Sequence, residues 1–148
     1  MLPSTLVDAK LIGMNVPAHF VCPMDQISAR TQGVSLSPAE QAVADGLTVP
    51  RRRNEWVAGR LVSKQLLVDS SLLTDRTNAD PALLSVLSRE DRSPAVFHDS
   101  LDEELPVNLS ISHRADLVMA AAVSPPHSVG VDVELVDPRS EAMLLNYL

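Results

Sequence analysis

The pattern of apolar and polar positions first predicts a short helix that begins after Ser37. Ser37 is a typical N-cap, Pro38 suits the first helical position, and Glu40 lies three residues after the cap. Gly46 is a typical residue just beyond a helix C-terminus. The sequence therefore predicts a helix from Pro38 to Asp45.

A longer helix is predicted from Arg52 to Val68, because apolar residues recur there at helical spacing. Gly59 falls in its middle, where glycine costs about 1 kcal/mol relative to alanine. We therefore expect another element or a ligand to approach the backbone closely at Gly59.

The next segments are predicted to be less regular. Asp80-Pro81 is a typical helix start, and the apolar face of this short helix would hold Leu83, Leu84 and Leu87. Residues 88–105 are charged and are predicted to be a loop. Residues 1–35 are predicted to be weak strands or irregular structure, because prolines interrupt their short apolar pieces.

Strand patterns dominate the end of the chain. Residues 107–112 and 129–135 alternate between apolar and polar, and residues 117–123 form a continuous apolar run. We predict three antiparallel strands here, with a turn at 124–128. The predicted fold class is α+β, with helices followed by a small antiparallel sheet.

Composition limits the possible classes of protein. A chain of 148 residues with 45% hydrophobic residues fits one packed domain. The net charge of −7 argues against non-specific binding to nucleic acid. The single cysteine, Cys22, fits a reducing compartment, and the longest apolar run is too short for a membrane helix. We therefore expect a soluble, cytoplasmic protein without a membrane or nucleic-acid partner.

The positive charge is concentrated on the predicted long helix. Residues 51–64 contain Arg51, Arg52, Arg53, Arg60 and Lys64, with Glu55 as their one acid. Guanidinium groups bind phosphate through two parallel hydrogen bonds, so this segment is a candidate phosphate site. The alternative is an ordinary helix face exposed to solvent.

Two polar groups accompany the predicted strands. Asp132 and Glu134 would lie on the same side of a strand, where two carboxylates can bind a hard cation such as Mg²⁺. Ser112 and His113 would end another strand, where a hydroxyl and an imidazole can meet a phosphate. The alternatives are a solvated acidic strand face and a polar turn.

Taken together and in this order, these segments resemble the Sfp-type 4′-phosphopantetheinyl transferases from about Leu36 to Arg139. The resemblance rests on four short motifs, namely Arg53-Asn54-Glu55-Trp56-Val57-Ala58-Gly59-Arg60, Ser110-Ile111-Ser112-His113, Val129-Gly130-Val131-Asp132-Val133-Glu134 and Pro138-Arg139.

The resemblance implies an enzyme that transfers the phosphopantetheine arm of coenzyme A to a serine of an acyl or peptidyl carrier protein and releases 3′,5′-ADP. It further implies that Asp132 and Glu134 hold Mg²⁺ against the pyrophosphate. The residues implied to contact coenzyme A phosphates are Arg53, Arg60, Ser112 and His113.

The chain departs from the family pattern at two places. Arg92-Ser93-Pro94 keeps the proline but lacks the glycine of a usual Gly-x-Pro stretch. The family also has a second lobe, related to the first by pseudo-two-fold symmetry, with a Trp-x-x-Lys-Glu-Ala motif. No such motif occurs before Leu148, so residues 36–148 are expected to be the N-terminal lobe, preceded by the irregular segment 1–35.

This departure leaves the catalytic residues unassigned, because the expected base and lysine belong to the second lobe. A complementing C-terminal half or a homodimer is one way to supply them. The first alternative is a truncated, non-catalytic remnant that binds coenzyme A or a carrier protein without turnover. The second is an adaptor whose basic helix docks an acidic partner and which has no nucleotide site.

Overall fold

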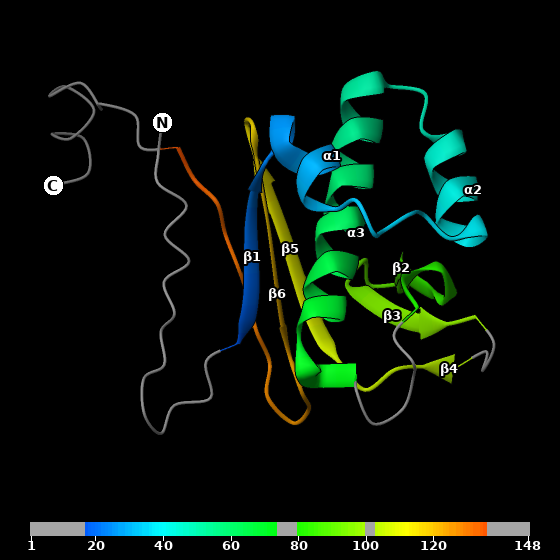
Figure 1. The fold of residues 1–148 in the computed structure, drawn as a ribbon, viewed down its shortest axis with the longest axis vertical. Helices are drawn as coiled ribbons and strands as arrows, with labels where there is room; N and C mark the ends of the chain where they lie inside the picture. Colours follow the sequence, from blue (N-terminus) through cyan, green and yellow to red (C-terminus); the bar gives the residue numbers. More distant parts are fainter. Residues whose placement is uncertain (1–16, 74–79, 100–102, 136–148) are drawn as a thin grey trace, which may run out of the picture.

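A computed structural model describes residues 17–73, 80–99 and 103–135 (Figure 1). A long helix packs against one face of a three-stranded sheet, and a second three-stranded sheet lies beyond the helix. The elements in chain order are β1 (Ala18–Pro23), η1 (Met24–Gln26), α1 (Ile27–Arg30), α2 (Pro38–Gly46), α3 (Pro50–Asp69), η2 (Ser71–Leu73), η3 (Pro81–Leu83), β2 (Leu84–Ser88), β3 (Pro94–His98), β4 (Glu103–Glu104), β5 (Asn108–Arg114) and β6 (Leu117–Val123).

The helix predictions for α2 and α3 are confirmed. The Ser37 hydroxyl accepts the Glu40 N–H at 3.2 Å, and the Glu40 carboxylate accepts the Ser37 N–H at 2.8 Å, so both halves of the capping box are present. Pro50 occupies the first turn of α3, where its missing N–H costs nothing.

The larger sheet has the order β1-β6-β5, and both pairings are antiparallel. The strands predicted at 107–112 and 117–123 are therefore confirmed as β5 and β6, and the α+β class is confirmed with them. β1 comes from the segment predicted to be weak strands or irregular, and it precedes the helices. The main core lies between this sheet and α3, where Val62 and Leu66 pack with Val118, Ala120 and Ala122.

The smaller sheet corrects two predictions. The helix expected after Asp80 is only the 3-10 turn η3, and Leu84 already begins a strand. The segment expected to be a loop at 88–105 contains β3 and β4. The leucine spacing fits a helix, but Leu84 and Val86 also alternate as on a strand, and antiparallel pairing with β3 decides between the two.

The prediction of a third antiparallel strand at 129–135 is wrong. This segment joins neither sheet. The N–H groups of Val131 and Val133 instead donate to the side-chain hydroxyls of Ser110 and Ser112, at 3.2 and 3.1 Å. The predicted alternation of half-buried and exposed side chains persists from Val129 to Glu134, but Leu135 is exposed. Figure 1 shows the segment on the side of the larger sheet opposite α3.

A buried ion pair joins α2 to α3. Lys64 Nζ lies 2.6 Å from Glu40 Oε1, and both side chains are completely buried. Lys64 also donates to the Ser35 carbonyl at 2.7 Å, and Glu40 Oε2 accepts the Val86 N–H at 3.0 Å. Every buried side-chain nitrogen and oxygen in the described part of the chain has a partner. The two charges therefore connect both helices to β2.

Within the residues that the structure describes, no helix is both long enough and apolar enough to cross a lipid bilayer.

Cys22 should be chemically inert in the folded chain. Its side chain is fully buried, and this burial raises the pKa of the thiol, so the reactive thiolate is scarce. We expect a thiol-specific chromogenic disulfide reagent at mildly alkaline pH to leave the native chain unmodified and to react completely in guanidinium chloride. Equal reaction rates in the two conditions would show that Cys22 is accessible.

Candidate functional site

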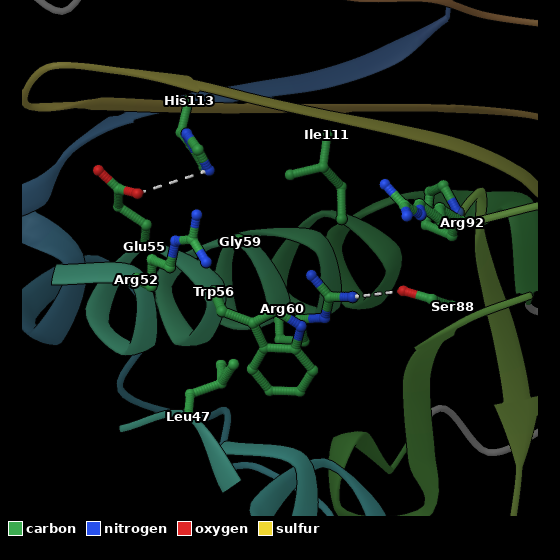
Figure 2. Close-up of a pocket in the computed structure, with 11 residues that line it drawn as sticks. Leu47, Arg52, Glu55, Trp56, Gly59, Arg60, Ser88, Arg92, Ile111 and His113 are labelled. Atoms are coloured by element: carbon green, nitrogen blue, oxygen red, sulfur yellow. Dashed lines mark hydrogen bonds and ion pairs between the residues drawn. The ribbon is translucent and has the colours of Figure 1, made fainter. Parts of the chain in front are cut away.

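A cavity of about 420 Å³ opens between α3, the β2–β3 turn and β5 (Figure 2). We call it the Arg60 cavity. It is lined by Leu47, Arg52, Glu55, Trp56, Gly59, Arg60, Ser88, Arg92, Pro94, Ile111 and His113.

The α3 contribution follows from helical spacing. Arg52, Trp56 and Arg60 are four residues apart, and Glu55 and Gly59 accompany them, so these side chains lie on one side of the helix. Three arginines and one histidine line the cavity against the single carboxylate of Glu55. The cavity therefore favours an anionic ligand.

Arg60 is held rigidly in this cavity. Its side chain is buried, its Nε donates to the Val86 carbonyl at 3.2 Å, and its guanidinium carbon lies 4.1 Å from the Trp56 ring centroid. A longer contact of 3.5 Å joins its Nη2 to the Ser88 hydroxyl. Burial lowers the pKa of Arg60 to about 10, and the nearby Glu40 partly opposes this effect. Arg60 thus remains a positioned cation at neutral pH.

His113 and Ile111 reach the same cavity from β5. Side chains alternate along a strand, so Ile111 and His113 point toward α3 (Figure 2). His113 Nε2 lies 3.8 Å from Glu55 Oε2. A methyl group at Gly59 would lie 3.2 Å from Ile111 Cγ2. The predicted close approach to Gly59 is therefore confirmed, and β5 is the approaching element.

The other predicted site residues do not line this cavity. Ser112 points to the opposite face of the sheet, where its Oγ lies 3.5 Å from Asp132 Oδ1. Glu134 Oε2 lies 3.9 Å from Nε of Arg114, the last residue of β5. Arg53 forms an ion pair of 3.3 Å with Asp45. The structure thus brings Arg60 and His113 together and places Ser112 beside Asp132 on the other side.

The carboxylates of Asp132 and Glu134 meet some of the requirements of a Mg²⁺ site. Asp132 and Glu134 are both exposed, and the Ser112 hydroxyl adds a third oxygen near Asp132. Such hard oxygen ligands suit Mg²⁺, which keeps several waters. Within residues 17–73, 80–99 and 103–135, however, no three metal-binding side chains cluster. The oxygen atoms of Asp132, Glu134 and Ser112 are therefore of the type that Mg²⁺ prefers, but they form an exposed site with too few protein ligands to enclose the ion.

Sequence reasoning did not single out several lining residues. Arg52 was named only within the basic segment 51–64, and its spacing of four to Trp56 and then to Arg60 could have placed it beside them. Arg92 and Ser88 lie in or beside a turn whose position depends on the pairing of β2 with β3. No local pattern indicates that this turn meets α3.

The described chain was also compared with known proteins. Neither the protein-family models nor the curated proteins match it. Among solved structures, a holo-(acyl-carrier-protein) synthase from Bacillus anthracis str. Ames in complex with CoA (3′,5′-ADP) is 23% identical, with a TM-score of 0.54. The holo-[acyl-carrier-protein] synthase of Neisseria meningitidis is 15% identical with a TM-score of 0.52, and the Plasmodium yoelii enzyme is 14% identical with a TM-score of 0.51.

These likenesses cover almost the whole of each neighbour. They span 73% of this chain in all three cases, and 93%, 95% and 91% of the three neighbours in the same order. The neighbours are holo-acyl-carrier-protein synthases rather than Sfp-type enzymes. The chain therefore has the α+β fold of these holo-acyl-carrier-protein synthases, so the resemblance expected from its motifs is confirmed at the level of the fold.

Proposed function

We propose that this chain is a 4′-phosphopantetheinyl transferase that binds coenzyme A in the Arg60 cavity. Its co-substrate is a serine of an acyl or peptidyl carrier protein, and its second product is 3′,5′-ADP. The observation that carries this proposal is the strongly cationic cavity on this particular fold. The description of the Bacillus anthracis neighbour as a complex with CoA (3′,5′-ADP) supports the choice of ligand.

In the proposed reaction, a bond forms between the carrier serine oxygen and the β-phosphorus of coenzyme A. The bond from that phosphorus to the 3′,5′-ADP leaving group breaks, and the serine proton passes to a general base. Arg60 and the other cavity cations bind the phosphates and stabilise their developing charge. Asp132 and Glu134 would hold Mg²⁺, which would supply positive charge to the pyrophosphate. Because both acids lie outside the Arg60 cavity, this role requires the pyrophosphate to extend beyond that cavity.

Intact-mass spectrometry tests the transfer. The chain is incubated with coenzyme A, Mg²⁺ and an apo carrier protein, and the carrier is expected to gain the mass of one phosphopantetheine group. A carrier whose acceptor serine is replaced by alanine serves as the control and should gain none. No gain, even after a C-terminal half is added, would contradict the proposed activity.

A second candidate is binding of coenzyme A or a carrier protein without turnover. It is favoured by the separation of Asp132 and Glu134 from the residues that line the Arg60 cavity. Calorimetry with coenzyme A distinguishes the two candidates when it is combined with the mass assay. Binding without any mass gain supports this second candidate, and turnover by the chain alone excludes it.

The proposed metal site gives a separate prediction. Asp132→Ala should abolish the part of coenzyme A affinity that depends on Mg²⁺, because one remaining carboxylate holds the ion poorly. Calorimetry with and without Mg²⁺ measures this difference. Asp116→Ala, which removes an acid from the β5–β6 turn, is the matched control. A Mg²⁺ effect of the same size in both variants would return Asp132 to the role of a solvated surface acid.

A further inference from the structure

Two arginines of the Arg60 cavity, Arg52 and Arg92, have side chains with no partner among the residues that the structure describes. Arg51 pairs with Glu55, Arg53 pairs with Asp45, and Arg60 bonds to β2. In the described ranges, the side chains of Arg52 and Arg92 form no hydrogen bond or ion pair, although both line the cavity. Their guanidinium groups are therefore free to bind a ligand.

The backbone at Arg92 is strained. The turn between β2 and β3 is closed by hydrogen bonds from Arg92 N to Arg89 O and from Arg89 N to Ser93 O, both of 2.9 Å. Its last position, Arg92, has a φ of 70°, in the left-handed region where hairpin loops of this length favour glycine. An arginine at this position is disfavoured by the fold, and strain of this kind concentrates at ligand-binding sites.

The two free arginines lie apart. Arg52 comes from the first turn of α3, and Arg92 comes from the β2–β3 turn. Figure 2 shows them on opposite sides of the cavity, with Arg60 and Trp56 between them. A ligand that engages both needs two separated anionic groups.

Coenzyme A has two such groups, the pyrophosphate and the ribose 3′-phosphate. We propose that Arg52 and Arg92 are specificity-determining residues, each of which contacts a different one of these two groups. This inference rests on the proposed function, and it selects coenzyme A over ligands that carry only one of the groups. It also places Arg52, rather than its neighbour Arg53, at the ligand.

The test is a cycle of variants and ligands measured by calorimetry. Wild type, Arg52→Ala and Arg92→Gly are each titrated with coenzyme A and with dephospho-coenzyme A, which lacks the 3′-phosphate. Each substitution should weaken coenzyme A binding about tenfold, as expected for a lost charge-assisted contact. In wild type, and in the variant that lacks the pyrophosphate contact, dephospho-coenzyme A should bind more weakly than coenzyme A by the same factor. In the variant that lacks the 3′-phosphate contact, the two ligands should bind with nearly equal affinity.

Two controls separate ligand contact from folding and from net charge. Arg92→Gly relieves the left-handed strain, so its melting temperature should stay unchanged or rise while its affinity falls. Arg30→Gln removes the same charge from α1, outside the cavity lining, and should change affinity less than twofold.

The outcomes also separate this inference from the proposed function. Equal discrimination between the two ligands in wild type and both variants would overturn the inference, as would a larger loss in Arg53→Ala than in Arg52→Ala. A different result is that wild type binds the two ligands as expected, with the expected changes in the two variants, and still fails to modify the carrier protein. That result would contradict only the catalytic part of the proposed function.

Discussion

Replacing Glu40 with glutamine is expected to lower the free energy of unfolding by about 3–5 kcal/mol, because it leaves Lys64 as a buried, unpaired charge. A domain of this size is stable by only about 5–15 kcal/mol, so this loss is a large part of the total. Urea unfolding followed by circular dichroism measures it. The effect should appear whether or not the chain binds coenzyme A.

A matched control and a double variant make this result specific. Asp45→Asn removes the exposed partner of Arg53 from the same helix and should cost less than about 1 kcal/mol. Combining Glu40→Gln with Lys64→Met should cost less than the sum of the two single changes, since no isolated charge remains. If Glu40→Gln lost no more stability than Asp45→Asn, the pair would not be the link between α2 and α3 that the structure indicates.

The second large effect is expected on ligand binding. Arg60→Met should weaken coenzyme A binding by about tenfold to a hundredfold, the size of one or two lost charge-assisted hydrogen bonds. Trp56 and the Val86 carbonyl already fix the guanidinium, so its positioning costs no further entropy on binding. Calorimetry with coenzyme A measures the loss, and urea unfolding shows whether the fold is retained.

Arg60→Lys distinguishes charge from geometry. Lysine keeps the positive charge but loses the planar fork and most of the stacking on Trp56, so we expect it to recover only part of the affinity. Full affinity in Arg60→Met would contradict the assignment of the cavity as the ligand site. The loss of stability in Arg60→Met should be smaller than in Glu40→Gln, because removing Arg60 also removes the cost of burying its charge.

The parts of the fold that the sequence predicted correctly are those with local causes. The capping box at Ser37 and the apolar spacing after Arg52 each act within a few turns, so α2 and α3 were predictable. β2 was mistaken for a helix because Leu83, Leu84 and Leu87 have helical spacing, while Leu84 and Val86 also fit a strand, and only the pairing of β2 with β3 decides the matter. The segment 129–135 has a strand pattern, but its N–H groups bind serine hydroxyls instead of a neighbouring backbone.

The candidate site was predictable only in part, because three separate stretches of chain form it. Arg60 and His113 were named from motifs, and both line the cavity. Arg92 lies in the cavity only because the β2–β3 turn folds against α3. Such a meeting depends on tertiary packing, which motif spacing does not report.

The position of β2 at the edge of the smaller sheet bears on how the chain avoids aggregation. β2 is an edge strand of the smaller sheet, and such edges readily pair with strands of other molecules. At its centre, the Val86 N–H donates to Glu40 and the Val86 carbonyl accepts from Arg60, so two charged side chains occupy the place of a fourth strand. The arginine assigned to the ligand therefore also protects this edge, and a variant that lacks it would leave one backbone acceptor open to another chain.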